Sequence, residues 1–356
     1  MKIYKLGGIL IKDEENLKAI DDFFQDSQPS CIVISAFAKT SNKLKNVAEL
    51  ASKNNLEHTF EICNELKDFH LELFPDQKQL IVDTFIELET LLKSISLIKE
   101  LNNRTLDRVL SFGDILAAKI ICDKYSNHNT YYLDPTNFLY CDGDFGFGNP
   151  NVDLSRKLFS ELDVDLSKHL IMPGFIGRNK DSQVITMGFE SSNLSAIIIA
   201  IITESSQVEI ITNVDGIKTV DPEVSSKFVH LEYMSYNDAK IAGKIGMKLL
   251  PEKMIQLAYE NNITVVFRGL NNNLKTLISP ESKSSNKLII QKNELYVLNI
   301  NQEDLNLLID NYPEIDFRYS SPHKYLIVYS SKPTLDNLAE LFFSNWEKPQ
   351  WFITDS

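Results

Sequence analysis

Short apolar segments alternate with amphipathic ones along most of the chain. SCIVISAF is a dense apolar run, which is typical of a strand buried on both faces of a parallel sheet. IYKLGGILI, NTYYLDP, HLIMPGFIGRN and VEIITNVDG predict further strands, and Gly7-Gly8 interrupts the first of them. Helical periodicity separates them, over about 13–26, 42–53 and 55–102. The alternation predicts an α/β domain with a mostly parallel sheet sandwiched by helices, whose ligands lie beyond the carboxyl ends of the strands.

The segment TLDRVLSFGDILAAKIICDKY shows a break in this pattern. It contains an apolar stretch, then Gly113-Asp114, then a second apolar stretch with helical spacing. Because glycine is disfavoured inside helices, we expect a tight turn here, with the Asp114 carboxylate directly after it. QVITMGFESSNLSAIIIAIITES predicts a strand, a loop and another helix.

The C-terminal part has a different pattern. Residues 279–287, SPESKSSNK, are polar and Ser-rich, as in a linker. After them, ELYVLNI, IDFRYS, KYLIVYS and QWFITD predict strands, and QEDLNLLIDNY and TLDNLAELFFSN predict helices. This βαββαβ order is typical of a small α+β module of ferredoxin-like type. The predicted organisation is an α/β domain over 1–278, a linker over 279–287 and the small module over 288–356.

The charge balance argues against several classes of partner. The 356 residues carry a net charge of −13, whereas a protein that binds nucleic acid normally presents a basic face. No segment approaches the roughly 18 apolar residues needed to span a bilayer, and the N-terminal apolar run is too short for a secretory signal. The four cysteines are scattered without metal-binding spacing. We therefore expect no nucleic acid, no membrane and no protein-bound metal site, with reduced thiols and a cytoplasmic location.

Four loops carry side chains suited to a nucleotide or an amino acid. Lys5 and Gly7-Gly8 end the first strand, where glycines let a phosphate approach the backbone. Ser41 opens one predicted helix and Ser192 precedes another, and helix N-termini bind anions. Asp114 offers a carboxylate to an ammonium group. A plain turn, an N-cap or a helix start also explains each loop when it is taken alone.

A fifth loop, TNVDGIKTVDPEV, follows the last predicted strand of the series. It combines Asp215-Gly216 with Asp221-Pro222 and places apolar Val214, Ile217 and Val220 between them. A simple connection needs only one or two turn residues. This composition indicates a loop with a fixed shape at the ligand-binding edge of the sheet.

In this order, the loops resemble motifs of the aspartokinases of the amino acid kinase superfamily. KLGG is similar to their Lys-Phe-Gly-Gly, ISAFAKTSN to a Val-Ser-Ala strand end running to Thr-Asn, and SFGD to a Ser-Phe-Gly-Glu turn. GFIGRN is similar to Gly-Phe-Ile-Gly, TNVDGIKTVDP to Thr-Asp-Val-Asp-Gly-Ile-Tyr-Thr-x-Asp-Pro, and GMKLL to Gly-Ala-Lys-Val-Leu. Each motif alone is weakly specific, but six in the same order cover nearly the whole chain.

The resemblance implies a kinase that uses ATP and Mg²⁺ to phosphorylate the side-chain carboxylate of aspartate or a related amino acid. It implies that Lys5 and Lys248 flank the transferred phosphoryl group. The residues implied at the nucleotide are Gly7, Gly8, Ser192, Thr212, Asp215, Gly216 and Lys218. Those implied at the amino acid are Ser41 and Asp114. The tail resembles an ACT module, which implies an amino acid effector and a homodimer or higher homo-oligomer, although a plain dimerisation module is the alternative.

The sequence departs from the family pattern on the substrate side. The family's Leu-Gly-Arg-Gly-Gly-Ser-Asp loop is MGFESSN here, so Phe189 replaces the arginine that clamps the substrate carboxylate, and Asn193 replaces the final aspartate. Glu190 adds repulsion toward an anion. The other departures are Lys218 for a tyrosine, Glu223 for an arginine, Pro251-Glu252 for His-Pro, and Asp114 for a glutamate.

Three interpretations follow from these departures. The chain is a divergent aspartate kinase in which Arg178 of GFIGRN takes over the carboxylate clamp. Alternatively, it is a pseudo-enzyme that kept the fold and serves as a regulatory or assembly partner. In the third interpretation it is a kinase for a different carboxylate or amino acid, which would explain why the substrate side has changed more than the KLGG side.

Overall fold

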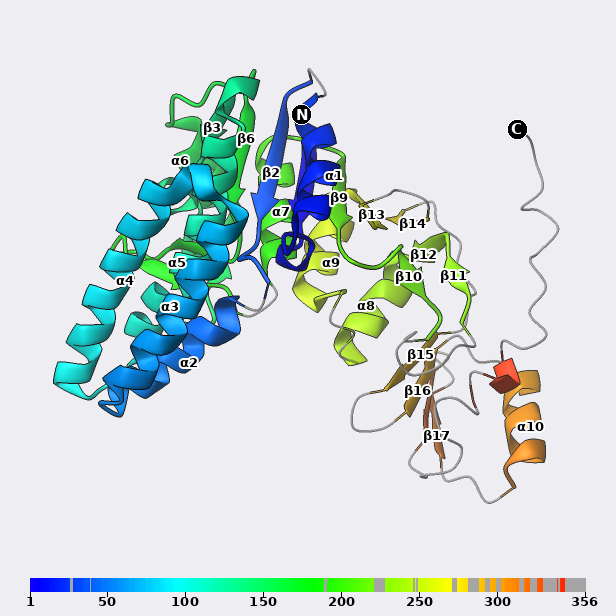
Figure 1. Ribbon diagram of the computed structural model, residues 1–356. Helices are drawn as coiled ribbons and strands as arrows, with labels where there is room; N and C mark the ends of the chain where they lie inside the picture. The colour runs from blue at the N-terminus through cyan, green and yellow to red at the C-terminus, as the bar shows by residue number, and fades with distance from the viewer. Residues whose placement is uncertain are drawn as a thin grey trace. The chain divides into compact units, whose positions relative to one another are not determined.

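A computed structural model gives the structure of the chain (Figure 1). The described residues are 1–25, 28–38, 40–188, 191–220, 228–245, 247, 249–270, 274–280, 288–291, 295–298, 302–313, 317–320, 325–328, 338 and 340–342. The chain forms two compact units, of which the first comprises Met1–Asp215 and Leu257–Asn273, and the second Gly216–Gln256 and Leu274–Ser356. The division at 279–287 that the sequence predicts stays a prediction.

The first unit is built on a parallel sheet. Its strands lie in the order β13-β9-β1-β2-β6-β3, and every neighbouring pair is parallel. Their bounds are Lys2–Leu6 for β1, Ser30–Ile34 for β2, Thr130–Tyr132 for β3, His169–Pro173 for β6, Gln207–Ile211 for β9 and Thr264–Arg268 for β13. The predicted α/β fold with a mostly parallel sheet is confirmed. The sequence analysis missed β13, because it ended the series of strands at β9.

Helices cover both faces of this sheet. All five side chains of β2 are buried, as the apolar run predicts. Ile32 and Ile34 lie in one core cluster with side chains of α1 and α5, so the alternation along a strand turns Cys31 and Val33 to the other face. There α7 contacts β1, β2 and β9. The helices of the unit are α1 (Glu14–Gln25), α2 (Thr40–Ser52), α3 (Leu56–Leu73), α4 (Lys78–Ile98), α5 (Asn103–Lys124), α6 (Val152–Ser160) and α7 (Ser192–Ile202).

One expectation was wrong: no turn interrupts the SFGD segment. Helix α5 runs continuously from Asn103 to Lys124 through Gly113. Glycine in a helix costs only about 1 kcal/mol relative to alanine, and packing offsets that cost here. A side chain at Gly113 would lie 2.9 Å from Cβ of Ala36 and 3.2 Å from Leu44, so the glycine allows α5 to pack closely against the segment that follows β2.

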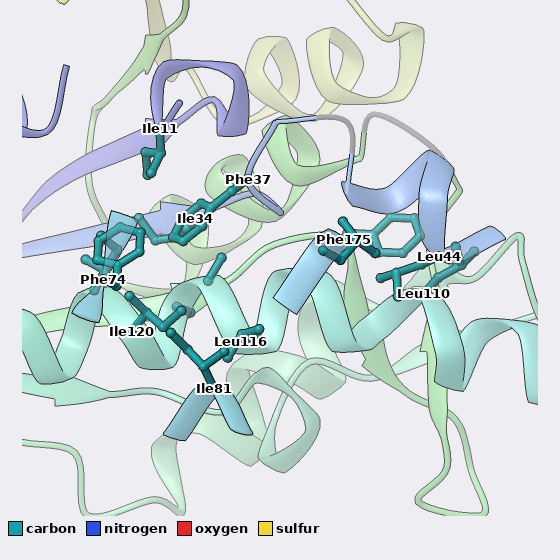
Figure 2. Close-up of a cluster of buried hydrophobic side chains, with 14 of the residues drawn as sticks. Ile11, Ile34, Phe37, Leu44, Phe74, Ile81, Leu110, Leu116, Ile120 and Phe175 are labelled. Atoms are coloured by element: carbon teal, nitrogen blue, oxygen red, sulfur yellow. The ribbon is translucent and has the colours of Figure 1, made fainter. Parts of the chain in front are cut away.

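Side chains of α2 to α5 make up most of a large apolar cluster, to which α1 and strands of the sheet also contribute (Figure 2). In Figure 2, Leu116 and Ile120 of α5 lie near Ile81 of α4. Two short antiparallel pairs complete the first unit, namely β4 (Cys141–Asp142) with β5 (Asn149–Pro150) and β7 (Ile176–Arg178) with β8 (Val184–Thr186). None of the four cysteines, all of which lie within the described residues, forms a disulfide. In the described residues, no helix is long and apolar enough to cross a membrane.

The second unit contains further paired strands. Strand β12 (Tyr233–Ser235) pairs in parallel with β14 (Lys275–Ser279), and β10 (Ile217–Lys218) pairs antiparallel with β11 (His230–Leu231). The unit also holds α8 (Tyr236–Ile245), and α9 (Glu252–Glu260) connects the two units along the chain.

The C-terminal residues form a four-stranded antiparallel sheet in the order β15-β16-β18-β17. Its elements are β15 (Leu288–Gln291), β16 (Leu295–Leu298), α10 (Gln302–Asn311), β17 (Phe317–Ser320) and β18 (Tyr325–Val328). The order β16-α10-β17-β18 matches the first four elements of the predicted βαββαβ module. Residues 338 and 340–342 are helical, whereas the last predicted strand lies outside the described residues. Assignment of the tail as an ACT-like module stays a prediction.

A buried histidine makes the stability of the first unit depend on pH. His70 of α3 is fully buried, its Nδ1 donates to the Leu66 carbonyl at 2.6 Å, and its ring stacks near Phe37. Burial lowers the pKa of His70 from 6.5 to about 4. Between these values the unfolded chain binds a proton that the folded chain excludes, so stability is lost as the pH falls.

We expect the free energy of unfolding to fall by about 2 kcal/mol from pH 7 to pH 5 through this group. Denaturant titrations of His70→Phe should show a shallower dependence on pH than the wild type. The exposed His58 offers a comparison variant, because His58→Gln leaves the buried His70 ring in place. Equal slopes for the His70 variant and the wild type would contradict the assignment.

Candidate active site

Two glycines and a lysine meet at the carboxyl end of β1. The amide of Gly7 donates to the Ile211 carbonyl at 2.9 Å. A side chain at Gly8 would overlap the carbonyl oxygen of Ala36, and the Gly8 carbonyl accepts from the amide of Ala38 at 2.9 Å. The Lys5 ammonium lies 3.7 Å from the point where a Cβ on Gly7 would stand. Only glycine fits at position 8, and the Lys5 cation lies close to the backbone of Gly7.

Asp114 of α5 brings a carboxylate to the same place. Its side chain is 3% exposed, and the amide of Ala36 donates to it. Burial raises the pKa of Asp114 to about 7, against the opposing effects of the Ala36 amide, the Lys5 charge and the Ser192 hydroxyl. A buried carboxylate of this kind is suited to pair with a cationic group of a ligand.

The N-terminus of α7 is the third component. The hydroxyl of Ser192, its first residue, donates to Oδ1 of Asp114 at 3.5 Å. A side chain at Gly174 would lie 2.6 Å from Cβ of Ser192, so β6 and α7 approach closely. Ser191 Oγ and Asn193 Oδ1 are buried and have no hydrogen-bond partner in the part of the chain that the structure describes. Free amides, the helix dipole and two unsatisfied polar side chains together suit this end of α7 to an anionic group.

The loop after β9 adds two further residues in the first unit. The amide of Thr212 donates to the Arg268 carbonyl at 3.0 Å, and its hydroxyl donates to Oδ1 of Asn213 at 3.2 Å. The carboxylate of Asp215 lies so close to Gly269 that a side chain there would overlap it. The VDG segment therefore has a fixed start next to β13, as its composition indicates.

The structure describes the continuation of this loop as part of the second unit. Gly216 has a positive φ of 75°, and a side chain there would lie 2.5 Å from the His230 ring and 2.7 Å from Thr276 Oγ1. The ammonium of Lys218 lies 4.5 Å from the centre of the Phe228 ring. The glycine is explained by turn geometry and the lysine by a cation–π contact, so nucleotide roles for both stay predictions.

Among the described residues, no hydrogen bond or ion pair joins Asp114 to Ser41 or Arg178, the two residues assigned to the amino acid. Ser41 is half-buried in the first turn of α2. Arg178 pairs with Val184 in the β7–β8 hairpin, and its amide donates to the Leu139 carbonyl. Its buried Nε has no hydrogen-bond partner within the described ranges. The buried Nε is consistent with an anionic ligand, but the clamp role stays a prediction. Of the other predicted positions, Lys248, Phe189, Glu190 and Glu223 lie outside the described residues.

The sequence analysis missed two contributors to this site. The Ala36 amide binds Asp114, and Gly174 allows α7 to approach β6. Gly174 lies within the GFIGRN motif, so the sequence offered a way to predict its role. The Ala36 amide could not be predicted in this way, because every residue except proline has a backbone N–H. Among the described residues, no three carboxylate, histidine or cysteine side chains gather as a metal cage. A Mg²⁺ ion entering with a nucleotide would be held mainly by phosphates, which is its usual mode of binding.

Comparison with known proteins agrees with this arrangement. Residues 1–269 match the model of the amino acid kinase family. The chain belongs to the amino acid kinase family. Its curated relatives include a bifunctional aspartokinase/homoserine dehydrogenase of Buchnera aphidicola, 26% identical over 84% of this chain and 39% of that protein. Aspartokinase 1 of Arabidopsis thaliana is 28% identical over 74% of this chain and 49% of its own length.

Solved structures show the same fold. Escherichia coli aspartokinase III in complex with aspartate and ADP superimposes with a TM-score of 0.75 and 18% identity, covering 97% of this chain and 83% of that chain. Its complex with lysine and aspartate gives a TM-score of 0.72, with coverage of 92% and 78%. The resemblance to aspartokinases is thereby confirmed. The chain nevertheless spans only 39% to 56% of the first three curated relatives it matches.

Burial of the Asp114 carboxylate should lower the free energy of unfolding at neutral pH, and replacing Asp114 should remove this cost. Its ordinary pKa of 3.8 is raised to about 7, so the unfolded chain ionises first and stability falls as the pH rises from about 4 to 7. Asp114→Asn should lack this fall and exceed the wild type in stability at pH 8 by about 2–4 kcal/mol. Denaturant titration measures the difference, and Asp123→Asn on the same helix is the exposed control. An Asp114 variant that follows the wild-type pH dependence would refute the buried ionisation.

Proposed function

We propose that the chain transfers the γ-phosphoryl group of ATP to the side-chain carboxylate of aspartate or a related amino acid. The observation that carries the proposal is the convergence of Lys5, Gly8, Asp114 and Ser192 at one edge of the parallel sheet. A cation, a glycine backbone without side chains, a helix N-terminus and a buried carboxylate are the parts such a transfer needs. Matches to aspartokinases support the choice of substrate class.

The reaction requires little covalent participation by the protein. An ionised carboxylate oxygen of the amino acid attacks the γ-phosphorus, the bond from that phosphorus to the bridging oxygen breaks, and ADP leaves with the electron pair. The product is an acyl phosphate, and no proton is transferred in this step. Lys5 neutralises charge on the transferred group, while the amides of α7 bind phosphate oxygens. Asp114 pairs with the substrate ammonium, which also stabilises its ionised form.

A second candidate is a kinase for a different acid, or a homologue with impaired activity. Asn193 supports it, because this buried amide stands where the aspartokinase motif has aspartate, and its Oδ1 has no hydrogen-bond partner among the described residues. Losing one partner of a charged hydrogen bond costs about 1.5–3 kcal/mol. In the sequence, Phe189 in place of the motif's arginine also supports a different substrate or impaired activity. We therefore infer weak activity toward aspartate unless Arg178 supplies the missing positive charge.

The proposal is tested by trapping the acyl phosphate with hydroxylamine. The purified chain, with Mg-ATP, is offered aspartate and then a panel of other amino acids and carboxylates. We expect turnover with at least one acid, and Lys5→Met should lower kcat by about 10²–10³-fold because it removes a charge that stabilises the transition state. The exposed Lys12 gives the matched control, and Lys12→Met should leave the rate unchanged.

Each outcome of the panel selects one interpretation. Turnover limited to another acid would identify a shifted substrate. Silence across the panel, with Mg-ATP still binding in a calorimeter, would establish the homologue without kinase activity. Failure to bind nucleotide at millimolar concentration would overturn the proposal entirely.

We further propose that the C-terminal sheet mediates self-association and binds an amino acid effector. Strands β15 and β17 form the two edges of this described sheet, and an open edge or face is commonly covered by a second copy. An Escherichia coli relative of the same fold has been crystallised with lysine as well as aspartate. This supports a search for amino acid effectors of the present chain.

Sedimentation velocity of the full chain tests the assembly. We expect a dimer or a higher oligomer of this 40.6 kDa chain at micromolar concentration. A chain that stays monomeric at every concentration up to about 100 µM would contradict the prediction. Its self-association would then be far weaker than that of an ordinary specific interface.

A further inference from the structure

A second buried carboxylate of α5 lies outside the cluster around Lys5. Asp107 is 1% exposed, and its carboxylate accepts three hydrogen bonds. Oδ2 accepts from the amides of Gly146 and Thr186, each at 2.8 Å, and Oδ1 accepts from the Thr186 hydroxyl at 2.7 Å. Burial raises the pKa of Asp107, while these bonds oppose the shift. The side chain thus ties two separate segments to one helix.

The segment that contains Thr186 leads along the chain to the start of α7, and the segment that contains Gly146 is hydrogen-bonded to it. The carbonyl of Thr186 accepts from Gly148 at 2.8 Å, which joins the loop before β5 to the end of β8. Directly after β8, Gly188 has a φ of 91°, and a side chain there would lie 3.6 Å from the Gly146 carbonyl. Only a few residues then remain before Ser192 opens α7. The position of Thr186 therefore constrains where the chain enters that helix.

A second tie connects the same stretch to the body of α7. The amide of Met187 donates to the Phe175 carbonyl at 2.9 Å, and the Phe175 amide donates to Ser195 Oγ at 3.0 Å. The end of β8 is consequently held on one side by Asp107 and on the other through Phe175. With both ends of this short segment fixed, the first turn of α7 has little freedom to shift.

Helix α5 joins this anchor to the candidate active site. Asp107 and Asp114 are seven residues apart, which places them on the same face of the helix, about two turns from each other. Asp114 accepts from Ser192 of α7, while Asp107 holds the segment that leads into α7. Helix α5 thus positions Asp114 itself and, through Asp107, also the N-terminus of α7 that contacts Asp114.

We propose that Asp107 is a positioning residue that fixes the N-terminus of α7 against Asp114 for the phosphoryl transfer. The inference rests on the proposed function, but its structural part does not need turnover. Asp107 acts through hydrogen-bond geometry rather than charge, because none of its three partners is a cation. An asparagine can reproduce that geometry: its carbonyl oxygen accepts from both amides, and its NH₂ donates to the Thr186 hydroxyl.

The test compares Asp107→Ala with Asp107→Asn in the trapping assay. We expect Asp107→Ala to lower kcat about 10- to 100-fold with little change in the KM for ATP, since small displacements of reacting groups have effects of this size. Asp107→Asn should restore the rate to within about fivefold of the wild type, as expected for geometry without charge. Asp123→Asn, at the exposed end of α5, is the matched control and should behave as the wild type.

A milder pair of variants covers the case in which Asp107→Ala does not fold. Thr186→Val removes only the hydroxyl donor and should lower kcat about 3- to 10-fold, whereas Thr186→Ser retains the hydroxyl and should not, consistent with the loss of one hydrogen bond. Wild-type kcat in Thr186→Val, or an Asp107→Asn variant as impaired as Asp107→Ala, would overturn the proposal.

Amide hydrogen exchange provides a readout that is independent of activity. Exchange of the Ser191 and Ser195 amides, which donate to the Gly188 and Ser191 carbonyls, should accelerate at least tenfold in Asp107→Ala, or in Thr186→Val if only that variant folds. It should stay at the wild-type rate in Asp107→Asn and Thr186→Ser. Unchanged protection of these amides would overturn the proposal even if activity fell. If the wild type itself phosphorylates no acid, the proposed function fails, and the exchange result alone decides the role of Asp107.

Discussion

The structure of the site depends on keeping the Asp114 carboxylate buried. A charge removed from water must be met by donors and by a neighbouring cation, and here these are the Ala36 amide, the Ser192 hydroxyl and Lys5. Ala36 can occupy this position only because Gly8 has no side chain, which would overlap the Ala36 carbonyl. The burial of Asp114 thus requires three features together: the close packing of α5, the glycine after β1 and the position of α7. Motifs far apart in sequence converge for this reason.

Much of this arrangement was predictable from the sequence because it follows from local pattern. The buried run of β2 identified a central parallel strand, and the order of motifs identified Lys5, Gly7 and Ser192 near one edge. The prediction of a turn at Gly113 was wrong because glycine can signal close packing as well as a chain reversal, and only tertiary contact distinguishes the two. Strand β13 (Thr264–Arg268) was not predicted, because the predicted series of strands ended at β9.

The features that were harder to predict involve backbone groups and packing distance. The Ala36 amide has no signature in residue identity, and the role of Asp107 depends on two segments that meet it only in the folded chain. Lys5, Gly7 and Gly8 match the aspartokinase pattern. Phe189 and Asn193 depart from it in the motif that precedes and opens α7. This division explains why membership of the family is plain while the identity of the substrate acid depends on experiment.

The most direct test of the account is a carboxyl ¹³C NMR titration of Asp114, with Asp114→Asn to assign the signal. The account predicts a pKa of about 7 in the free protein, because burial outweighs the donors and Lys5. Saturation with an amino acid substrate and a non-hydrolysable Mg-ATP analogue should lower that pKa by at least about one unit, since an ammonium group then pairs with the carboxylate. Titration near 4 in the free protein, or a signal unmoved by the ligands, would contradict the central role assigned to this buried charge.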